Sequence, residues 1–99
     1  MSTYADPLSV LSDPTRRAIF ERLRSGPRAV GEIASGLPVS RPAVSQHLRK
    51  LEAARLVKVT PQGNRRLYAV DRRGLDELRE WMDGFWDVAL HNFKEAAER

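Results

Sequence analysis

The sequence has no cysteine among its 99 residues. Disulfides, thiolate metal sites and a cysteine nucleophile are therefore excluded. No apolar run approaches the about 20 residues of a membrane span or the roughly 7 of a signal-peptide core. We expect a cytoplasmic protein of one domain, residues 1–99, with no membrane contact and no cofactor. A chain of this length buries limited surface, so it is marginally stable alone and often needs a partner subunit.

Acidic residues are nearly missing from the middle of the chain. Residues 39–73 carry nine Lys or Arg and only Glu52 and Asp71 as acids, whereas residues 74–99 carry three basic and seven acidic residues. The net charge of +4 therefore comes from one cationic block. Such asymmetry favours contact with a polyanion such as nucleic acid, although charge alone fits a solvated basic surface equally well.

Helix-start signals divide the first half of the chain into short helices. Asp6-Pro7 and Asp13-Pro14 each place a capping acid before a proline that the first helical turn tolerates, and Ser40 is a good cap before Arg41-Pro42. Apolar residues at helical spacing follow each signal. We expect four helices, approximately over residues 6–11, 14–24, 30–37 and 41–54.

Two strands and a long helix complete the predicted order. Residues 56–60 and 66–70 read as strands, and Gly63-Asn64 between them tolerates the positive φ of a hairpin turn. Asp71 can cap a final helix from about residue 72 to 98. The expected fold class is mainly α with a two-stranded β-wing. It is a winged helix-turn-helix in the order helix-helix-helix-helix-strand-strand-helix.

The fourth helix has the side chains that a helix in the DNA major groove requires. Val44, Leu48 and Leu51 recur on one face and must point to the core, so the other residues face outward or sideways. Short side chains permit close approach, Gln46 and Arg41 can bond base edges, and the later basic residues can reach phosphates. The alternative is a plain solvated helix face. The residues predicted to contact double-stranded DNA here are Ser40, Arg41, Ala43, Ser45, Gln46, His47, Arg49 and Lys50; for His47, a capping or packing hydrogen bond is the other interpretation.

The hairpin directly after this helix carries no acid at its tip and two adjacent arginines. A wing beside a recognition helix adds phosphate or minor-groove contacts, so Gln62, Asn64, Arg65 and Arg66 are further candidates. Arg65 and Arg66 alternate sides of a strand, so we expect only one of them to reach DNA. The alternative is an edge hairpin that its charge protects from aggregation. A protein-interaction module on the same scaffold is the rival function, but its surface would be acidic or apolar rather than basic.

Four segments carry the most specific motifs of the chain. They are Leu-Ser-Asp-Pro-Thr-Arg-Arg at 11–17, Val-Gly-Glu-Ile-Ala at 30–34, the stretch 40–51 with Ser-x-His-Leu-x-x-Leu, and Leu-Val at 56–57. Together they resemble ArsR-type, arsenic-repressor-like transcriptional regulators over about residues 5–90. The resemblance implies a homodimeric winged helix that binds a two-fold-symmetric operator and usually represses transcription. It also implies that Pro42 lies with Arg41, Ser45 and Gln46 at the base-facing end of the recognition helix.

The chain departs from the metal-sensing members of that family. The thiolate pair that such sensors place just before the Glu-Leu or Asp-Leu of the third helix falls at Ala29 and Gly31, and neither residue can bind a metal. On the last helix, His91 and Glu95 are too few ligands unless a second subunit completes the site. No enzymatic constellation or Gly-rich phosphate loop is present, so we expect neither a metal site nor an enzyme. An organic effector, a partner protein or no effector at all are the open alternatives.

Four of the seven aromatic residues lie in the last helix, on an apolar stripe wider than one small core requires. Burying a large apolar side chain contributes roughly 1.5–3 kcal/mol, so exposing several favours association. We expect a homodimer interface formed by Leu8, Leu11, Leu78, Trp81, Met82, Phe85, Trp86, Ala89 and Phe93. Two alternatives are that these rings only close the core of one chain, or that an apolar effector pocket lies between subunits.

Overall fold

Four shorter helices, a small sheet and one long helix make up residues 6–98, the part of the chain that the structure, a computed structural model, describes. Residues 1–5 and 99 of the predicted domain lie outside this part. The helices are α1 (Pro7–Val10), α2 (Pro14–Glu21), α3 (Val30–Ala34), α4 (Arg41–Ala53) and α5 (Arg72–Ala97). The strands are β1 (Arg28–Ala29), β2 (Val57–Gln62) and β3 (Arg65–Val70). The predicted fold class is confirmed, and the structure adds β1, which the prediction lacked.

The predicted capping residues begin three of the helices. The Asp6 carboxylate accepts the Leu8 N–H at 3.1 Å, and the Asp13 carboxylate accepts the Arg16 N–H at 3.1 Å. The Ser40 hydroxyl accepts the Ala43 N–H at 3.2 Å. A proline occupies the first turn in each case, where its missing N–H needs no partner. The α2 helix ends three residues earlier than predicted, and turns continue from there to residue 25.

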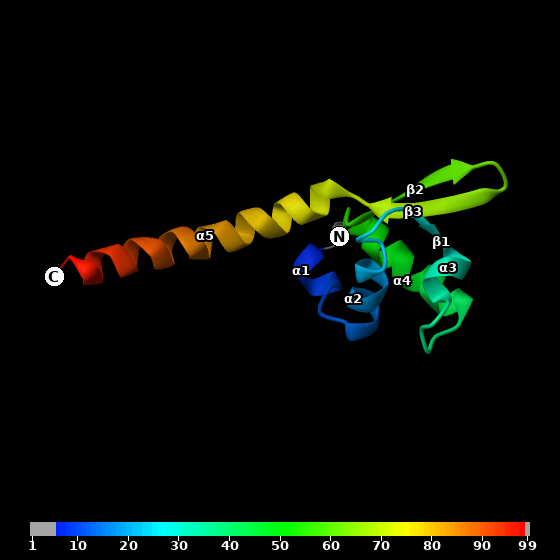
Figure 1. The fold of residues 1–99 in the computed structure, drawn as a ribbon, viewed down its shortest axis with the longest axis horizontal. Coiled ribbons are helices and arrows are strands. Elements are labelled where there is room, and N and C mark those ends of the chain that lie inside the picture. Colours follow the sequence, from blue (N-terminus) through cyan, green and yellow to red (C-terminus); the bar gives the residue numbers. More distant parts are fainter. Residues whose placement is uncertain (1–5, 99) are drawn as a thin grey trace, which may run out of the picture.

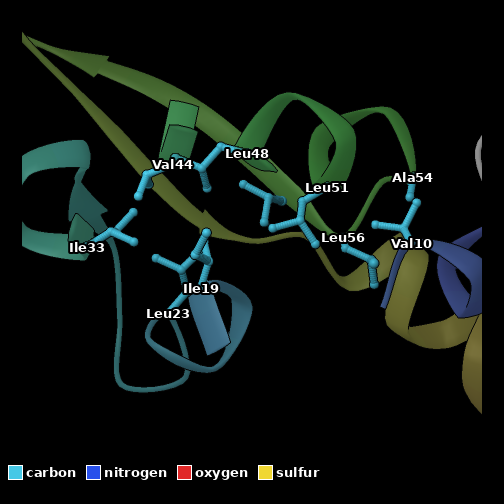
Figure 2. Close-up of a cluster of buried hydrophobic side chains, with 10 residues drawn as sticks. Val10, Ile19, Leu23, Ile33, Val44, Leu48, Leu51, Ala54 and Leu56 are labelled. Carbon is cyan, nitrogen blue, oxygen red and sulfur yellow. The ribbon is translucent and has the colours of Figure 1, made fainter. Parts of the chain in front are cut away.

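The core lies between the first four helices, with further contributions from the turn after α2 and from the segment that leads from α4 into β2. Figure 2 shows side chains from α1, α2, α3 and α4 converging on one apolar cluster. Val44, Leu48 and Leu51 of α4 are fully buried in it, as their spacing predicted. The remaining buried members of the cluster are Val10, Ile19, Leu23, Ile33, Ala54, Leu56 and Val57. One face of α4 is therefore fixed against the core, which determines the face that it shows to solvent.

The wing is the hairpin of β2 and β3, and β1 pairs with the other edge of β3 to complete an antiparallel sheet in the order β1-β3-β2. Both wing strands are longer than predicted, because pairing continues to Gln62 opposite Arg65. The turn is consequently only Gly63-Asn64. Gly63 has φ 61°, whereas Asn64 does not have a positive φ, the combination typical of a type II′ hairpin turn.

The α5 helix leaves the body of the molecule as a single rod, and the wing projects from the opposite end (Figure 1). The molecule therefore measures 63 × 34 × 23 Å. Only the beginning of α5 packs on the rest of the chain: Leu78 and Trp81 meet Pro7 and Leu8 of α1 around a cavity of about 130 Å³. The C-terminal half of α5 is exposed along its whole length.

Asp71 anchors the start of α5. Its backbone N–H donates to the Leu56 carbonyl at 2.8 Å, and its carboxylate accepts the Arg73 N–H at 3.0 Å as the helix cap. The Arg73 guanidinium also donates to this carboxylate, with the shortest contact at 2.7 Å. Asp71 is only 5% exposed. The hydrogen bond from the Arg73 side chain is the largest cause that holds the pKa of Asp71 below its usual 3.8, and it outweighs the opposing effect of desolvation.

This ion pair predicts an acid-sensitive contribution to stability. A carboxyl whose pKa is lowered by folding stabilises the fold above its unfolded pKa, and that stability is lost as the pH falls through the folded pKa. Asp71→Asn keeps a capping oxygen but no charge. We expect its free energy of unfolding at pH 7 to be lower than that of the parent protein, and the difference between the two proteins to narrow below about pH 4. Urea denaturation of both proteins across this pH range measures this difference in free energy of unfolding. A difference that stays constant down to about pH 2 would contradict a stabilising role for the charge of Asp71.

Candidate nucleic-acid interface

The predicted recognition residues are those of α4 that lie outside its buried face, together with its cap Ser40. The α3 and α4 helices form the helix-turn-helix, joined by residues 35–40. Because the apolar face of α4 is buried, its other residues reach solvent. Ser40, Arg41, Pro42, Gln46, Arg49 and Lys50 are exposed, and Ala43, Ser45 and His47 are half-buried. Basic side chains lie at both ends of the exposed set, with Arg41 in the first turn of α4 and Arg49 and Lys50 near its C-terminal end.

A second feature fixes the C-terminal end of α4 and directs the chain into the wing. The Leu56 N–H donates to the Leu51 carbonyl at 3.0 Å, and the Arg55 N–H donates to the Glu52 carbonyl at 2.9 Å. Arg55 itself has φ 60°. This is a Schellman motif with arginine in the left-handed position that glycine usually occupies. The motif joins the recognition helix to β2 without a flexible linker.

The wing tip carries its four candidate residues, Gln62, Asn64, Arg65 and Arg66, on exposed positions. The two arginines differ in their surroundings. The Arg65 guanidinium forms an ion pair with Glu32 of α3, and the same carboxylate oxygen accepts the Ala29 N–H at 3.2 Å. Sequence reasoning gave Glu32 no role in the site, but its contact with Arg65 ties the tip of the wing to the helix-turn-helix.

A cavity of about 310 Å³ separates the wing from the start of α4. Arg41 of α4 and Arg65 and Arg66 of the wing line it, together with Ala29, Val30 and Asn64. The structure therefore brings together arginines from the recognition helix and from the hairpin, although they are far apart in the sequence. A cleft with three guanidinium groups and one neighbouring carboxylate retains an excess of positive charge.

The basic side chains of α4 and the wing differ from those of α5 in whether a carboxylate lies beside them. Within residues 6–98, no carboxylate lies within 4.0 Å of the charged groups of Arg41, Arg49, Lys50 and Arg66. On α5, by contrast, Arg72 pairs with Asp76 and Arg79 with Asp83 along the same helix. The acidic rod points away from the wing (Figure 1). Within this part of the chain, the α4 helix and the wing thus carry these four cations without a paired carboxylate, whereas two of the arginines of α5 are paired along that helix.

Most of the predicted interface residues of the last helix are solvent-exposed in the single chain. Phe85 is 63% exposed, Trp86 68% and Phe93 74%. The rings of Trp81 and Phe85 stack edge to face with centroids 4.9 Å apart. Leu8, Met82 and Ala89 are also exposed, whereas Leu11 and Leu78 are half-buried. The interpretation in which these rings only close the core of one chain is wrong, because most of them do not touch the core.

No three His, Asp or Glu residues gather in the described part of the chain in a way that could hold a metal ion. His91 meets Glu95 alone, with Nε2 3.3 Å from a carboxylate oxygen. None of the helices from α1 to α5 is long and apolar enough to cross a membrane.

An exposed, positively charged recognition helix after a short helix and turn, followed by a cationic hairpin, defines the class of winged helix-turn-helix proteins. Comparison with other proteins agrees. A family described as "Helix-turn-helix domain" matches residues 11–60. The chain belongs to the ArsR-type family of helix-turn-helix transcriptional regulators, as its motifs implied.

Three proteins illustrate this membership. The HTH-type transcriptional regulator Rv2034 of Mycobacterium tuberculosis is 56% identical over 96 residues, which cover 94% of this chain and 90% of that protein. The transcriptional repressor SdpR of Bacillus subtilis is 33% identical, over 76% of this chain and 83% of the relative. A solved structure described as the ArsR family transcriptional regulator RHA00566 superposes with a TM-score of 0.76 at 28% identity, covering 84% of this chain and 91% of that chain.

Proposed function

We propose that this transcriptional regulator is a homodimeric repressor that binds a two-fold-symmetric operator in double-stranded DNA through α4 and the wing. One observation carries the proposal: the exposed side of α4 and the neighbouring wing hold basic side chains that no carboxylate neutralises, apart from the Arg65–Glu32 pair. A duplex with closely spaced phosphates is the partner that such a surface fits best. A relative that is named a transcriptional repressor supports repression rather than activation.

The proposed roles follow from side-chain chemistry and exposure. Gln46 and Arg41 are exposed and can form two parallel hydrogen bonds to a base edge, so we assign sequence reading to them. Arg49 and Lys50 lie further along α4 and contact phosphates. The small residues Ala43, Ser45 and Pro42 allow the helix to approach the groove, and Ser40 caps it. On the wing, Gln62, Asn64 and Arg66 bind the backbone or minor groove, whereas Arg65 is engaged with Glu32.

The proposed dimer uses the apolar stripe of α5. Leu78, Met82, Phe85 and Ala89 follow one another at intervals of three and four residues, so they lie on one face of the rod. Pairing this face with its copy, with help from α1, buries side chains that water otherwise contacts. A two-fold axis near α5 would set two α4 helices about 34 Å apart, one helical turn of DNA, or a multiple of that spacing.

Gln46→Ala tests the reading of bases. We expect it to lower affinity for the operator by about 1–3 kcal/mol per half-site, because two hydrogen bonds to one base are lost. Affinity for random duplexes should change little. Fluorescence anisotropy with both kinds of duplex at several salt concentrations measures these effects.

Arg66→Ala is the matched control. Loss of a phosphate contact should weaken binding to operator and random DNA alike and reduce the salt slope by about 1. An equal loss on both duplexes for Gln46→Ala would refute its role in base reading. Repression itself is tested with a reporter whose promoter contains the selected operator: expression should fall when the protein is present and recover with Gln46→Ala.

A further inference from the structure

The geometry points to Arg16 of α2 as the residue that positions His47 of the recognition helix, so that His47 donates a hydrogen bond from Nε2 to a DNA phosphate. This inference rests on the proposed DNA-binding function. Arg16 belongs to the core-facing side of α2 and is not among the residues expected to touch DNA. Its side chain is only 13% exposed.

Two nitrogens of the Arg16 guanidinium donate hydrogen bonds, and the third forms a longer ion pair. Nη1 donates to the carbonyl of Val10 at the end of α1, at 3.1 Å. Nη2 lies 3.8 Å from the Asp13 carboxylate, which also caps α2 through the Arg16 N–H. Nε donates to Nδ1 of His47 at 3.4 Å. Because two of these partners belong to fixed backbone or to a helix cap, the position of Nε towards His47 is determined by α1 and α2.

This contact selects one form of the His47 ring. A guanidinium can only donate hydrogen bonds, so the nitrogen that it meets must be the acceptor. Nδ1 therefore carries no proton, and the neutral ring carries its proton on Nε2. Functional histidines are often arranged in this way: a hydrogen bond at one ring nitrogen determines whether the other nitrogen carries the proton.

The free nitrogen of His47 reaches the surface. Nε2 has no hydrogen-bond partner among residues 6–98, and no side-chain nitrogen or oxygen in this part of the chain is both buried and unpaired. His47 follows the base-reading Gln46 on α4 and precedes Arg49, to which we assign a phosphate contact. This N–H on the middle of the helix is a donor without an acceptor in the described part of the chain, and phosphate oxygens are the acceptors that line a DNA groove.

The tautomer can be measured directly by ¹⁵N NMR of the full-length protein without DNA. We expect the His47 signals of a neutral ring protonated at Nε2, and a mixture of both tautomers in Arg16→Met. Arg17→Met removes a charge from the adjacent exposed position and should leave the His47 tautomer unchanged. A ring protonated at Nδ1 in the parent protein would overturn the inference, whatever the DNA measurements give.

The role on DNA is tested by a double-mutant cycle. Arg16→Met and His47→Phe should each weaken binding to operator and random duplexes roughly tenfold, about one hydrogen bond to a charged group. Combining them should add no further loss, because both remove the same contact. His47→Gln, which retains a donor near the position of Nε2, should recover most of the affinity.

The outcomes separate the possible failures. Additive losses in the double variant, or unchanged affinity with His47→Phe, would overturn the positioning role; the His47 variants decide the question even if Arg16→Met fails to fold. If the parent protein binds no duplex, the proposed function fails, and the tautomer measurement still reports whether Arg16 orients His47.

Discussion

Phe85→Glu is expected to convert the proposed dimer into a folded monomer and to weaken operator binding by about a hundredfold or more. Phe85 occupies the middle of the apolar stripe on α5, and it is 63% exposed in the single chain. The substitution therefore removes little from the core. In the proposed dimer, however, it buries a carboxylate without a partner, which costs several kcal/mol. A monomer can occupy only one half of a symmetric operator at a time, so the gain from binding two halves is lost.

Sedimentation equilibrium measures the state of association, and circular dichroism shows whether α5 stays helical. Lys94→Gln is the control, since it makes the same change in charge on α5 and leaves the apolar stripe intact; it should remain dimeric. If Phe85→Glu sediments as the parent protein does, the α5 interface is wrong even if the protein binds DNA.

Gly74→Ala is expected to destabilise the fold by about 3 kcal/mol or more, although alanine is normally the better helix former. A Cβ at position 74 would lie 2.6 Å from the Arg55 carbonyl oxygen and 2.8 Å from that of Ala54. Both contacts are backbone atoms at the end of α4, so no side chain can rotate away. The Gly74 N–H also donates to the Arg55 carbonyl at 2.7 Å. Adding the methyl group forces α5 away from α4 and lengthens this bond.

The same helix provides the matched control. Gly84 has no neighbouring atom within 4 Å of an added Cβ. Gly84→Ala should therefore stabilise the protein by roughly 0.5–1 kcal/mol, the ordinary preference for alanine in a helix. Thermal and urea denaturation of both variants show whether Gly74→Ala lowers the stability of the protein while Gly84→Ala raises it. A Gly74→Ala protein as stable as its parent would contradict the close approach of α5 to the end of α4.

The parts of the fold that the sequence predicted are those with local causes. The caps at Asp6, Asp13 and Ser40, and the apolar face of α4, depend on residues within a few positions of each other. The β1 strand could not be predicted, because two residues have no periodicity and become a strand only by pairing with β3. The wing extends through Pro61 for a similar reason. Proline usually ends a strand, but β2 is at the edge of the sheet, where a missing N–H is tolerated.

In the candidate site, too, the features with local causes were predictable from the sequence and the contacts between distant elements were not. Periodicity identified the buried face of α4 formed by Val44, Leu48 and Leu51, whereas Ala43, Ser45 and His47 among the remaining residues are half-buried. The contacts between elements were not predictable from local pattern. Glu32 and Arg65 are 33 residues apart, and Arg16 and His47 are 31 apart. Each pair meets only because packing of the core brings its elements together. Local pattern therefore predicts candidate DNA-contacting side chains, but not the residues from other elements that pack against them.

Selection of bound fragments from random duplex DNA by the purified protein is the most direct test of the interface on α4 and the wing. The expected result is a recovered site with two symmetric halves about 10 base pairs apart, or a multiple of that spacing, bound with an affinity that falls steeply as salt rises. The contrary result is no enrichment of any sequence and no binding of any duplex at low salt.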